Sequence, residues 1–155
     1  MDVLLSFLVF VCSYFAMEFV AWFTHKYIMH GFLWVLHKDH HTNENKGFIQ
    51  KNDTFFLIFA LPGAFLTIWG ALHTFNLLFW ARLGITFYGL TYFLLHEVYI
   101  HRRFNYLKNI DHPYFVALRK AHRVHHKYIQ KTPGENFGLL LFPLKYYVEA
   151  KKTIK

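Results

Sequence analysis

The chain has 155 residues, of which 55% are hydrophobic and 21% aromatic, and its formal net charge is +8 at pH 7. Because the basic residues are separated from long apolar runs, this composition indicates a small membrane protein with basic flanks. It excludes a soluble nucleic-acid-binding protein, so no nucleic-acid partner is expected. The single cysteine, Cys12, excludes an intramolecular disulfide and a cysteine-based zinc site.

Three apolar runs are long enough to cross a membrane. They cover residues 3–24, 54–72 and 75–95, and each has about the 20 residues that a bilayer core requires. The first run lacks the basic start of a signal peptide and is too long for one, so we expect it to be retained. Residues 137–148 are apolar but too few to span, which favours an interfacial or re-entrant segment. We predict an all-α integral membrane protein with three to four transmembrane helices, forming a single domain over residues 1–155.

The positions of Lys and Arg predict the orientation in the membrane. Of the 17, four lie at positions 26–51, one is Arg82 in the third run, and twelve follow residue 95. Cytoplasmic loops near membrane spans are enriched in Lys and Arg. We therefore expect the N-terminus outside and the C-terminal third in the cytosol, in the inner membrane of a bacterium.

Ten of the twelve histidines form two copies of one pattern, HxxxxH followed by HxxHH. Neutral imidazole is the commonest side-chain ligand for iron, copper and zinc, and ten ligands suit two metal ions better than one. Both copies begin at the cytosolic ends of predicted spans, so a shared cytosolic, histidine-rich helical cap is possible. His73 and His112 lie outside the pattern and are not predicted as ligands. The predicted metal ligands are His25, His30, His37, His40, His41, His96, His101, His122, His125 and His126.

The spacing constrains how these imidazoles point. In HxxHH they stand at i, i+3 and i+4, within about 100° of one another on an α-helix, so all three can face one centre. The HxxxxH pairs are five residues apart, about 140° around a regular helix. Either the helix is distorted at these pairs, or the two ligands bind different metals. After Pro113 we expect an amphipathic helix with histidines on one face and basic side chains on the other.

Three carboxylates are candidates for hydrogen-bonding to ligand histidines. Glu18 lies seven residues before His25 on the same helical face, inside the membrane, where an unpaired carboxylate is costly. It either orients a ligand histidine or is protonated and bonded to a neighbouring helix. Asp39 and Glu97 lie inside the histidine patterns, although a solvated or capping role is an equal alternative for Asp39. Beyond the metal ligands, no catalytic residue is identified.

These segments resemble the signatures of a known family. They are EFVAWFTHKYIMHGFLWVLHKDHH from Glu18, HEVYIHRRF from His96, AHRVHHK from Ala121 and the tail GENFGLLLFPLKYY. They are similar to motifs of bacterial β-carotene hydroxylases, in the fatty-acid hydroxylase and sterol desaturase superfamily, and all ten histidines map onto motif positions. The resemblance implies a membrane non-haem di-iron monooxygenase that hydroxylates C3 of β-ionone rings, converting β-carotene through β-cryptoxanthin to zeaxanthin. It also implies two iron ions, O2 and electrons supplied externally by ferredoxin or a similar donor.

Two other functions share part of this signature. The same di-iron site acts on fatty acids or sterols elsewhere in the superfamily, and the histidines do not separate these substrates. A non-enzymatic membrane metal-binding or transport protein would need polar groups along its spans, where Glu18 and Arg82 are the charged candidates. The chemistry favours an oxygenase, since activation of dioxygen needs a redox metal with open positions. The lack of a plastid-type transit segment favours a bacterial member over a plant one.

Overall fold

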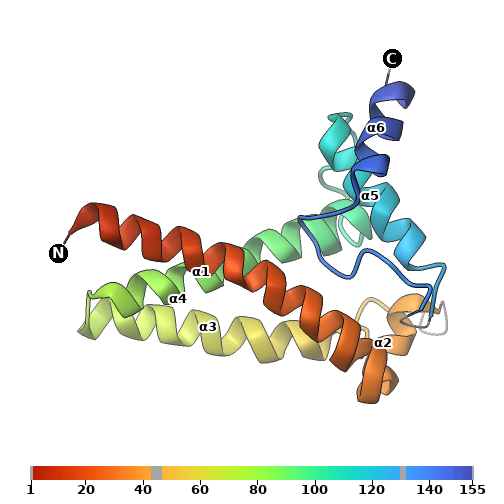
Figure 1. The fold of residues 1–155 in the computed structure, drawn as a ribbon. Helices are drawn as coiled ribbons and strands as arrows, with labels where there is room; N and C mark the ends of the chain where they lie inside the picture. Colours follow the sequence, from red (N-terminus) through yellow and green to blue (C-terminus); the bar gives the residue numbers. More distant parts are fainter. Residues whose placement is uncertain (1, 43–46, 130–131, 155) are drawn as a thin grey trace.

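The computed structural model describes residues 2–42, 47–129 and 132–154, and within these ranges all regular structure is helical. Lys46, Lys131 and Lys155, which the orientation argument counts, lie outside the described residues. Helices α1, α3 and α4 form an elongated bundle, and α2, α5 and α6 gather at one end of it (Figure 1). The elements, with η for a π-helix, are α1 (Val3–Phe23), η1 (Thr24–Phe32), α2 (Trp34–His41), α3 (Asp53–His73), α4 (Leu77–Tyr92), η2 (Phe93–Ile100), α5 (Pro113–His125) and α6 (Leu144–Thr153).

Three continuous helical stretches are long and apolar enough to span a membrane, Val3–Phe32, Asp53–His73 and Leu77–Ile100. They confirm the three predicted spans and extend the first and third to include π-helical ends. Large apolar side chains project outward from them; Phe15 is 61% exposed and Phe65 is 63% exposed. Such surfaces are unfavourable in water and suit lipid, so the chain is an integral membrane protein.

Small residues allow the spanning helices to approach closely. A Cβ atom on Gly84 of α4 would clash with the carbonyl oxygen of Phe10 in α1, so a larger residue does not fit there. Hydrogen bonds between hydroxyl groups add to this packing, with 2.8 Å between the Oγ1 atoms of Thr67 and Thr86. Close packing and interhelical hydrogen bonds are what hold helices together where lipid removes the hydrophobic driving force.

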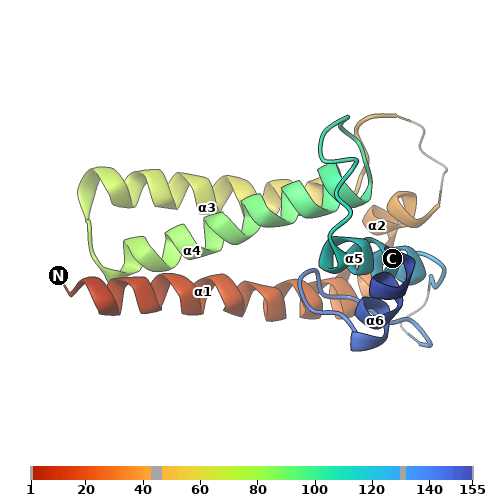
Figure 2. The ribbon, with the colours of Figure 1, turned by 90° about the horizontal axis from the view of Figure 1, so that it is seen from above.

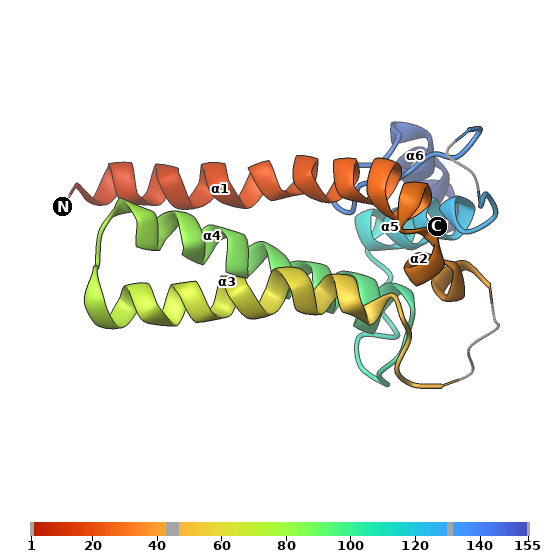
Figure 3. The same ribbon diagram turned by 90° about the horizontal axis from the view of Figure 1, so that it is seen from below.

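Both histidine patterns lie at the same end of the bundle. The N-terminus and the α3–α4 connection are at the opposite end from α2, α5 and α6, as two further views show (Figures 2 and 3). His73 is at the α3–α4 end, where its Nδ1 lies 3.0 Å from the carbonyl oxygen of Trp69. The structure thus confirms the predicted helical cap and places His73 at the other end of the bundle. The side of the membrane on which the cap lies stays a prediction.

The cap is built by α5 and α6 packing on each other. Pro113 occupies the first turn of α5, and the Nδ1 atom of His112 accepts the backbone N–H of Tyr114 at 3.3 Å. His112 is therefore a helix cap, a role common for polar side chains at this position. Residues 137–148 form a loop followed by the start of α6, and they make no spanning helix. The buried contact between the two helices consists of Ala117, Ala121, Tyr146 and Ala150.

Candidate metal centre

The two π-helices explain how histidines five residues apart can lie on the same side of a helix. A π-helix has hydrogen bonds between residues i and i+5, and its wider turn brings two such side chains toward one face. The backbone N–H of His101 donates to the carbonyl oxygen of His96 at 2.9 Å, which joins the second pair in this way. The ring centroids are 4.6 Å apart in this pair and 5.1 Å apart for His25 and His30. Of the two alternatives, helix distortion is therefore present in both copies.

Nine of the ten imidazoles form two adjacent clusters. Within each cluster, one potential ligand atom from every member lies within 4.8 Å of all the others. His96 lies beside the cluster that contains His40 and His122, with its ring centroid 4.9 Å from that of His40 and 4.7 Å from that of His122. The rings of His41 and His126 stack at 4.3 Å where the clusters meet. Cluster one is His25, His30, His37, His41 and His125, and cluster two is His40, His101, His122 and His126.

Each HxxHH segment divides its imidazoles between the two clusters. His37 and His41, four residues apart, belong to cluster one, whereas His40 belongs to cluster two. At the end of α5 the arrangement is reversed, since His122 and His126 belong to cluster two and His125 belongs to cluster one. The three imidazoles of each segment therefore do not meet at one centre, as the spacing would allow, but are divided between two clusters. Each cluster consequently combines ligands from both halves of the chain.

The distances between ring nitrogens match ligands on a common ion. Imidazole–metal bonds of about 2.0–2.1 Å, as at zinc, place two neighbouring ligand nitrogens roughly 2.9–3.4 Å apart. The buried Nε2 of His40 has no hydrogen-bond partner in the part of the chain that the structure describes. Measured Nε2–Nε2 distances are 3.1 Å for His25–His37, 3.1 Å for His37–His41, 3.2 Å for His30–His125, 2.9 Å for His101–His122 and 2.8 Å for His122–His126.

The opposite ring nitrogen, Nδ1, faces an oxygen in six of these histidines. Ligand histidines characteristically donate this second N–H to a carbonyl or carboxylate, which fixes the tautomer and the ring orientation. The oxygens and their distances from Nδ1 are Phe137 O at 2.9 Å from His25, Ile129 O at 2.8 Å from His30, Asn52 Oδ1 at 2.6 Å from His37, Gln50 Oε1 at 3.2 Å from His40, Glu97 Oε1 at 2.7 Å from His96 and Glu135 O at 3.0 Å from His125.

The pair His30 and His125 shows why this arrangement fits a cation. A backbone carbonyl only accepts hydrogen bonds, so both Nδ1 atoms carry their hydrogens toward Ile129 and Glu135. In neutral rings both Nε2 atoms then present lone pairs to each other, 3.2 Å apart. Two facing lone pairs repel, whereas a metal ion that accepts both is stabilised. The donor set therefore fits a metal, and these clusters are able to hold one.

Burial keeps the cap imidazoles in the form that binds metals. Removal from water lowers the pKa of His37 and of His126 to about 3, and that of His101 and of His125 to about 2. Neighbouring imidazoles lower these pKa values further, because like charges repel. All four rings are therefore neutral near pH 7, with a lone pair available for coordination.

The three candidate carboxylates have different surroundings. Glu97 hydrogen-bonds to His96 and is paired with Arg103 at 2.8 Å, so it lies where a histidine-orienting carboxylate was predicted. Asp39 accepts the backbone N–H of Lys51 at 2.6 Å, in the connection that precedes α3. Arg103 also contacts Asp53 at 2.6 Å and thereby ties η2 to the start of α3.

Glu18 contacts a helix and a loop rather than a histidine. The hydroxyl of Tyr88 in α4 donates to Oε2 at 2.7 Å. Oε1 accepts three consecutive backbone N–H groups, from Leu139 at 2.9 Å, Leu140 at 2.8 Å and Leu141 at 3.0 Å. Every one of these partners is a donor, which suits an ionised carboxylate. Glu18 is thus bonded to a neighbouring helix, as in the second alternative, but its carboxylate accepts all four bonds, whereas a protonated acid would donate one. The loop that it holds also carries Phe137, whose carbonyl oxygen lies 2.9 Å from Nδ1 of His25.

Sequence reasoning did not identify Asn52 or Gln50 as histidine partners. Both lie between the first histidine pattern and α3, and Asn52 is 7% exposed although it is polar. A polar pair directly before an apolar run is a weak signal, since such residues usually cap helices. The backbone carbonyls that bond to His25, His30 and His125 carry no side-chain signal at all.

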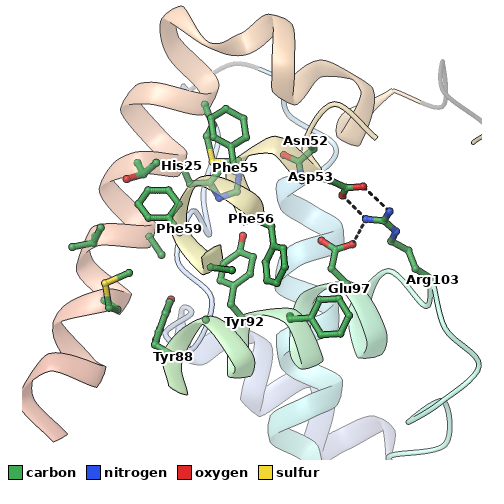
Figure 4. Close-up of a pocket in the computed structure, with 18 of the residues that line it drawn as sticks. His25, Asn52, Asp53, Phe55, Phe56, Phe59, Tyr88, Tyr92, Glu97 and Arg103 are labelled. Atoms are coloured by element: carbon green, nitrogen blue, oxygen red, sulfur yellow. Dashed lines mark hydrogen bonds and ion pairs between the residues drawn. The ribbon is translucent and has the colours of Figure 1, made fainter. Parts of the chain in front are cut away.

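A cavity of about 290 Å³ lies between α1, α3 and α4, beside cluster one. His25 forms part of its wall, and Phe55, Phe56 and Phe59 of α3 face it (Figure 4). At one end the Arg103 guanidinium is bonded to Asp53 and Glu97 (Figure 4). The remaining wall is almost wholly apolar or aromatic, which gives an apolar space next to a candidate metal site.

Comparisons with known proteins agree with this geometry. A family model described as "Fatty acid hydroxylase" matches residues 10–146. "Beta-carotene hydroxylase" of Paracoccus sp. (strain PC1) is 37% identical over 89% of the chain and 85% of its own length. The protein of the same name in Pseudescherichia vulneris is 37% identical over 88% of the chain and 77% of its length. "Beta-carotene 3-hydroxylase, chloroplastic" of Gentiana lutea is 37% identical over 82% of the chain and 40% of its length. No solved structure matches.

Proposed function

We propose that this chain, which belongs to the fatty acid hydroxylase family, is a β-carotene hydroxylase that adds a hydroxyl group at C3 of β-ionone rings. The observation that carries the proposal is the pair of buried histidine clusters in a membrane protein. Its similarity to bacterial proteins named β-carotene hydroxylase extends over most of their length and supports the proposal. The substrate would be β-carotene, converted through β-cryptoxanthin to zeaxanthin. A long polyene dissolves in lipid, so a site at the end of a spanning bundle suits it.

Two iron ions are the cofactors we infer, one for each cluster, with His96 completing the ligands of cluster two. Bound iron supplies the activation of dioxygen that attack on an unreactive C–H bond requires. In the overall reaction the C–H bond becomes C–OH and the second oxygen atom leaves as water. That balance consumes two electrons and two protons, and we infer that ferredoxin or a similar protein donates the electrons.

The protein's own groups prepare this chemistry. The oxygens at Nδ1 hold the ligand rings in fixed tautomers and aim their Nε2 atoms at the cluster centres. Burial excludes water from the clusters; His125 is 0% exposed and His37 is 1% exposed. Glu97 would increase the donor strength of His96 through its negative charge. We further propose a single domain in a bacterial inner membrane, with the N-terminus outside and the cap in the cytosol.

Expression in a host that accumulates β-carotene tests the function. We expect β-cryptoxanthin and zeaxanthin to appear with the native chain and with His73→Ala, a matched control at the opposite end of the bundle. His125→Ala should leave the pigment unchanged while the protein still inserts into the membrane. Unchanged β-carotene in cells that contain iron-loaded native protein would contradict the proposal, and an oxidised fatty acid or sterol in those cells would identify the alternative substrate.

A further inference from the structure

We infer that the cavity between α1, α3 and α4 receives one β-ring of the substrate and that Gly89 keeps this space open. The inference rests on the proposed function and specifies where its substrate binds. His25 is the connection, because it lines the cavity and also belongs to cluster one. A ring in this cavity would therefore lie next to the metal centre.

The lining favours an uncharged hydrocarbon. Phe55, Phe56 and Phe59 present aromatic side chains to the space (Figure 4). The charged groups at its end are already paired, since Arg103 bonds to both Asp53 and Glu97. A ligand with its own charge would have to break those bonds or remain unpaired in an apolar site, which is unfavourable. The walls also come from three spanning helices, so the ligand can enter from lipid.

The volume favours one ring rather than the whole substrate. An apolar cavity of about 150 Å³ binds benzene, which has six carbons. At that ratio the nine carbons of a β-ring with its three methyl groups need about 225 Å³, whereas forty carbons need about 1,000 Å³. The cavity holds about 290 Å³. It thus accommodates a single end group, and the polyene would continue into the membrane.

Gly89 is the position where the cavity depends on a missing side chain. It lines the cavity from α4, and a Cβ atom built there meets no other atom within 4 Å. A larger residue would therefore extend into the empty space without displacing protein atoms. Glycine in a helix interior is also less stable than alanine by roughly 0.5–1 kcal/mol, so replacement does not weaken α4 itself. These two facts make Gly89 a specificity-determining residue that can be tested by filling the space.

The test compares Gly89→Ala and Gly89→Leu in purified, iron-loaded protein with β-carotene in detergent or lipid vesicles, supplied with O2 and reduced ferredoxin. The four carbons of a leucine side chain would occupy space that the nine-carbon ring needs, so we expect turnover to fall about tenfold or more. Gly89→Ala should give a smaller loss. Iron content should stay at the native value in both variants, and the melting temperature should be at or above its native value. Leu90→Phe is the matched control, because Leu90 is 50% exposed on the same helix and the added bulk would face outward.

Native turnover in Gly89→Leu would overturn the inference and would place the ring elsewhere. Loss of iron together with activity would also contradict it, because the added side chain would then have disturbed cluster one rather than filled an independent space. Failure of the proposed function is a different result, in which the native protein itself leaves β-carotene unchanged. If the native protein instead hydroxylates an acyl chain, and Gly89→Leu blocks that reaction, the occupant of the cavity is the acyl chain and not the ring.

Discussion

Replacement of Glu18 tests how the membrane bundle holds the loop of residues 132–143, which carries the hydrogen-bond partner of His25 in cluster one. Its carboxylate accepts four hydrogen bonds, from the backbone N–H groups of Leu139, Leu140 and Leu141 and from the hydroxyl of Tyr88. A hydrogen bond to a charged group contributes about 1.5–3 kcal/mol to stability, and one between neutral groups about 0.5–1.5 kcal/mol. Glu18→Gln retains the shape but removes the charge. If each bond weakens by about 1 kcal/mol, the expected loss of unfolding free energy is about 3–4 kcal/mol.

The matched variants should follow an order set by these contacts. Tyr88→Phe removes one bond and should cost about 2 kcal/mol, less than Glu18→Gln. Gly138→Ala should also destabilise, because its Cβ would lie 2.7 Å from Oε1 of Glu18. The loop carries Phe137, whose carbonyl accepts the Nδ1–H of His25 at 2.9 Å, so Glu18→Gln should weaken metal retention as well.

Denaturation in detergent micelles measures the stability of each variant, and competition with a chelator measures metal retention. Limited proteolysis of residues 132–143 reports directly on whether the loop is released. Native stability in both Glu18→Gln and Glu18→Ala, with an equally protected loop, would refute the reasoning. An equal loss in Tyr88→Phe and Glu18→Gln would show that the three backbone contacts contribute nothing.

Three further predictions concern the clusters. Glu97→Gln should lower the affinity for metal about 10–100-fold at the cluster beside His96, because it removes the charge that orients this histidine. A titration with a chelator should then show that one of the two bound metal ions is released more easily, and equal weakening of both would contradict the prediction. His40→Ala should reduce the iron bound per chain, measured by elemental analysis, and abolish hydroxylation without changing topology; full iron content would remove His40 from the ligand set. In acid denaturation curves, the metal-free protein should lose stability as the pH falls from about 6.5 to about 3. Over this range the histidines of the unfolded chain bind protons, whereas the folded rings of His37 and His126, with pKa values of about 3, stay neutral. Constant stability across that range would show that these rings are not buried.

Much of the fold follows from local properties of the sequence. A spanning helix is defined by the length and apolarity of one segment, so residues 54–72 were identified to within a residue at each end of α3. Pro113 likewise predicted the start of α5, since its fixed backbone angle suits a first helical turn. The spacing of His25 and His30 required a distorted helix or a division between metals, and the π-helix over Thr24–Phe32 shows the distortion.

The repeated pattern of ten histidines at the ends of two spans predicted a metal centre, and nine of them do come together in two clusters that are able to hold a metal. The exchange of His40 and His125 between the clusters could not be predicted, because it depends on how α2 and α5 face each other in the folded chain. The same holds for the acceptors: His25 bonds to a carbonyl oxygen 112 residues away, and Glu18 bonds to N–H groups 121–123 residues away. Every residue carries a carbonyl, and every residue except proline carries an N–H. The sequence therefore cannot mark which of them the folded chain brings to a buried side chain.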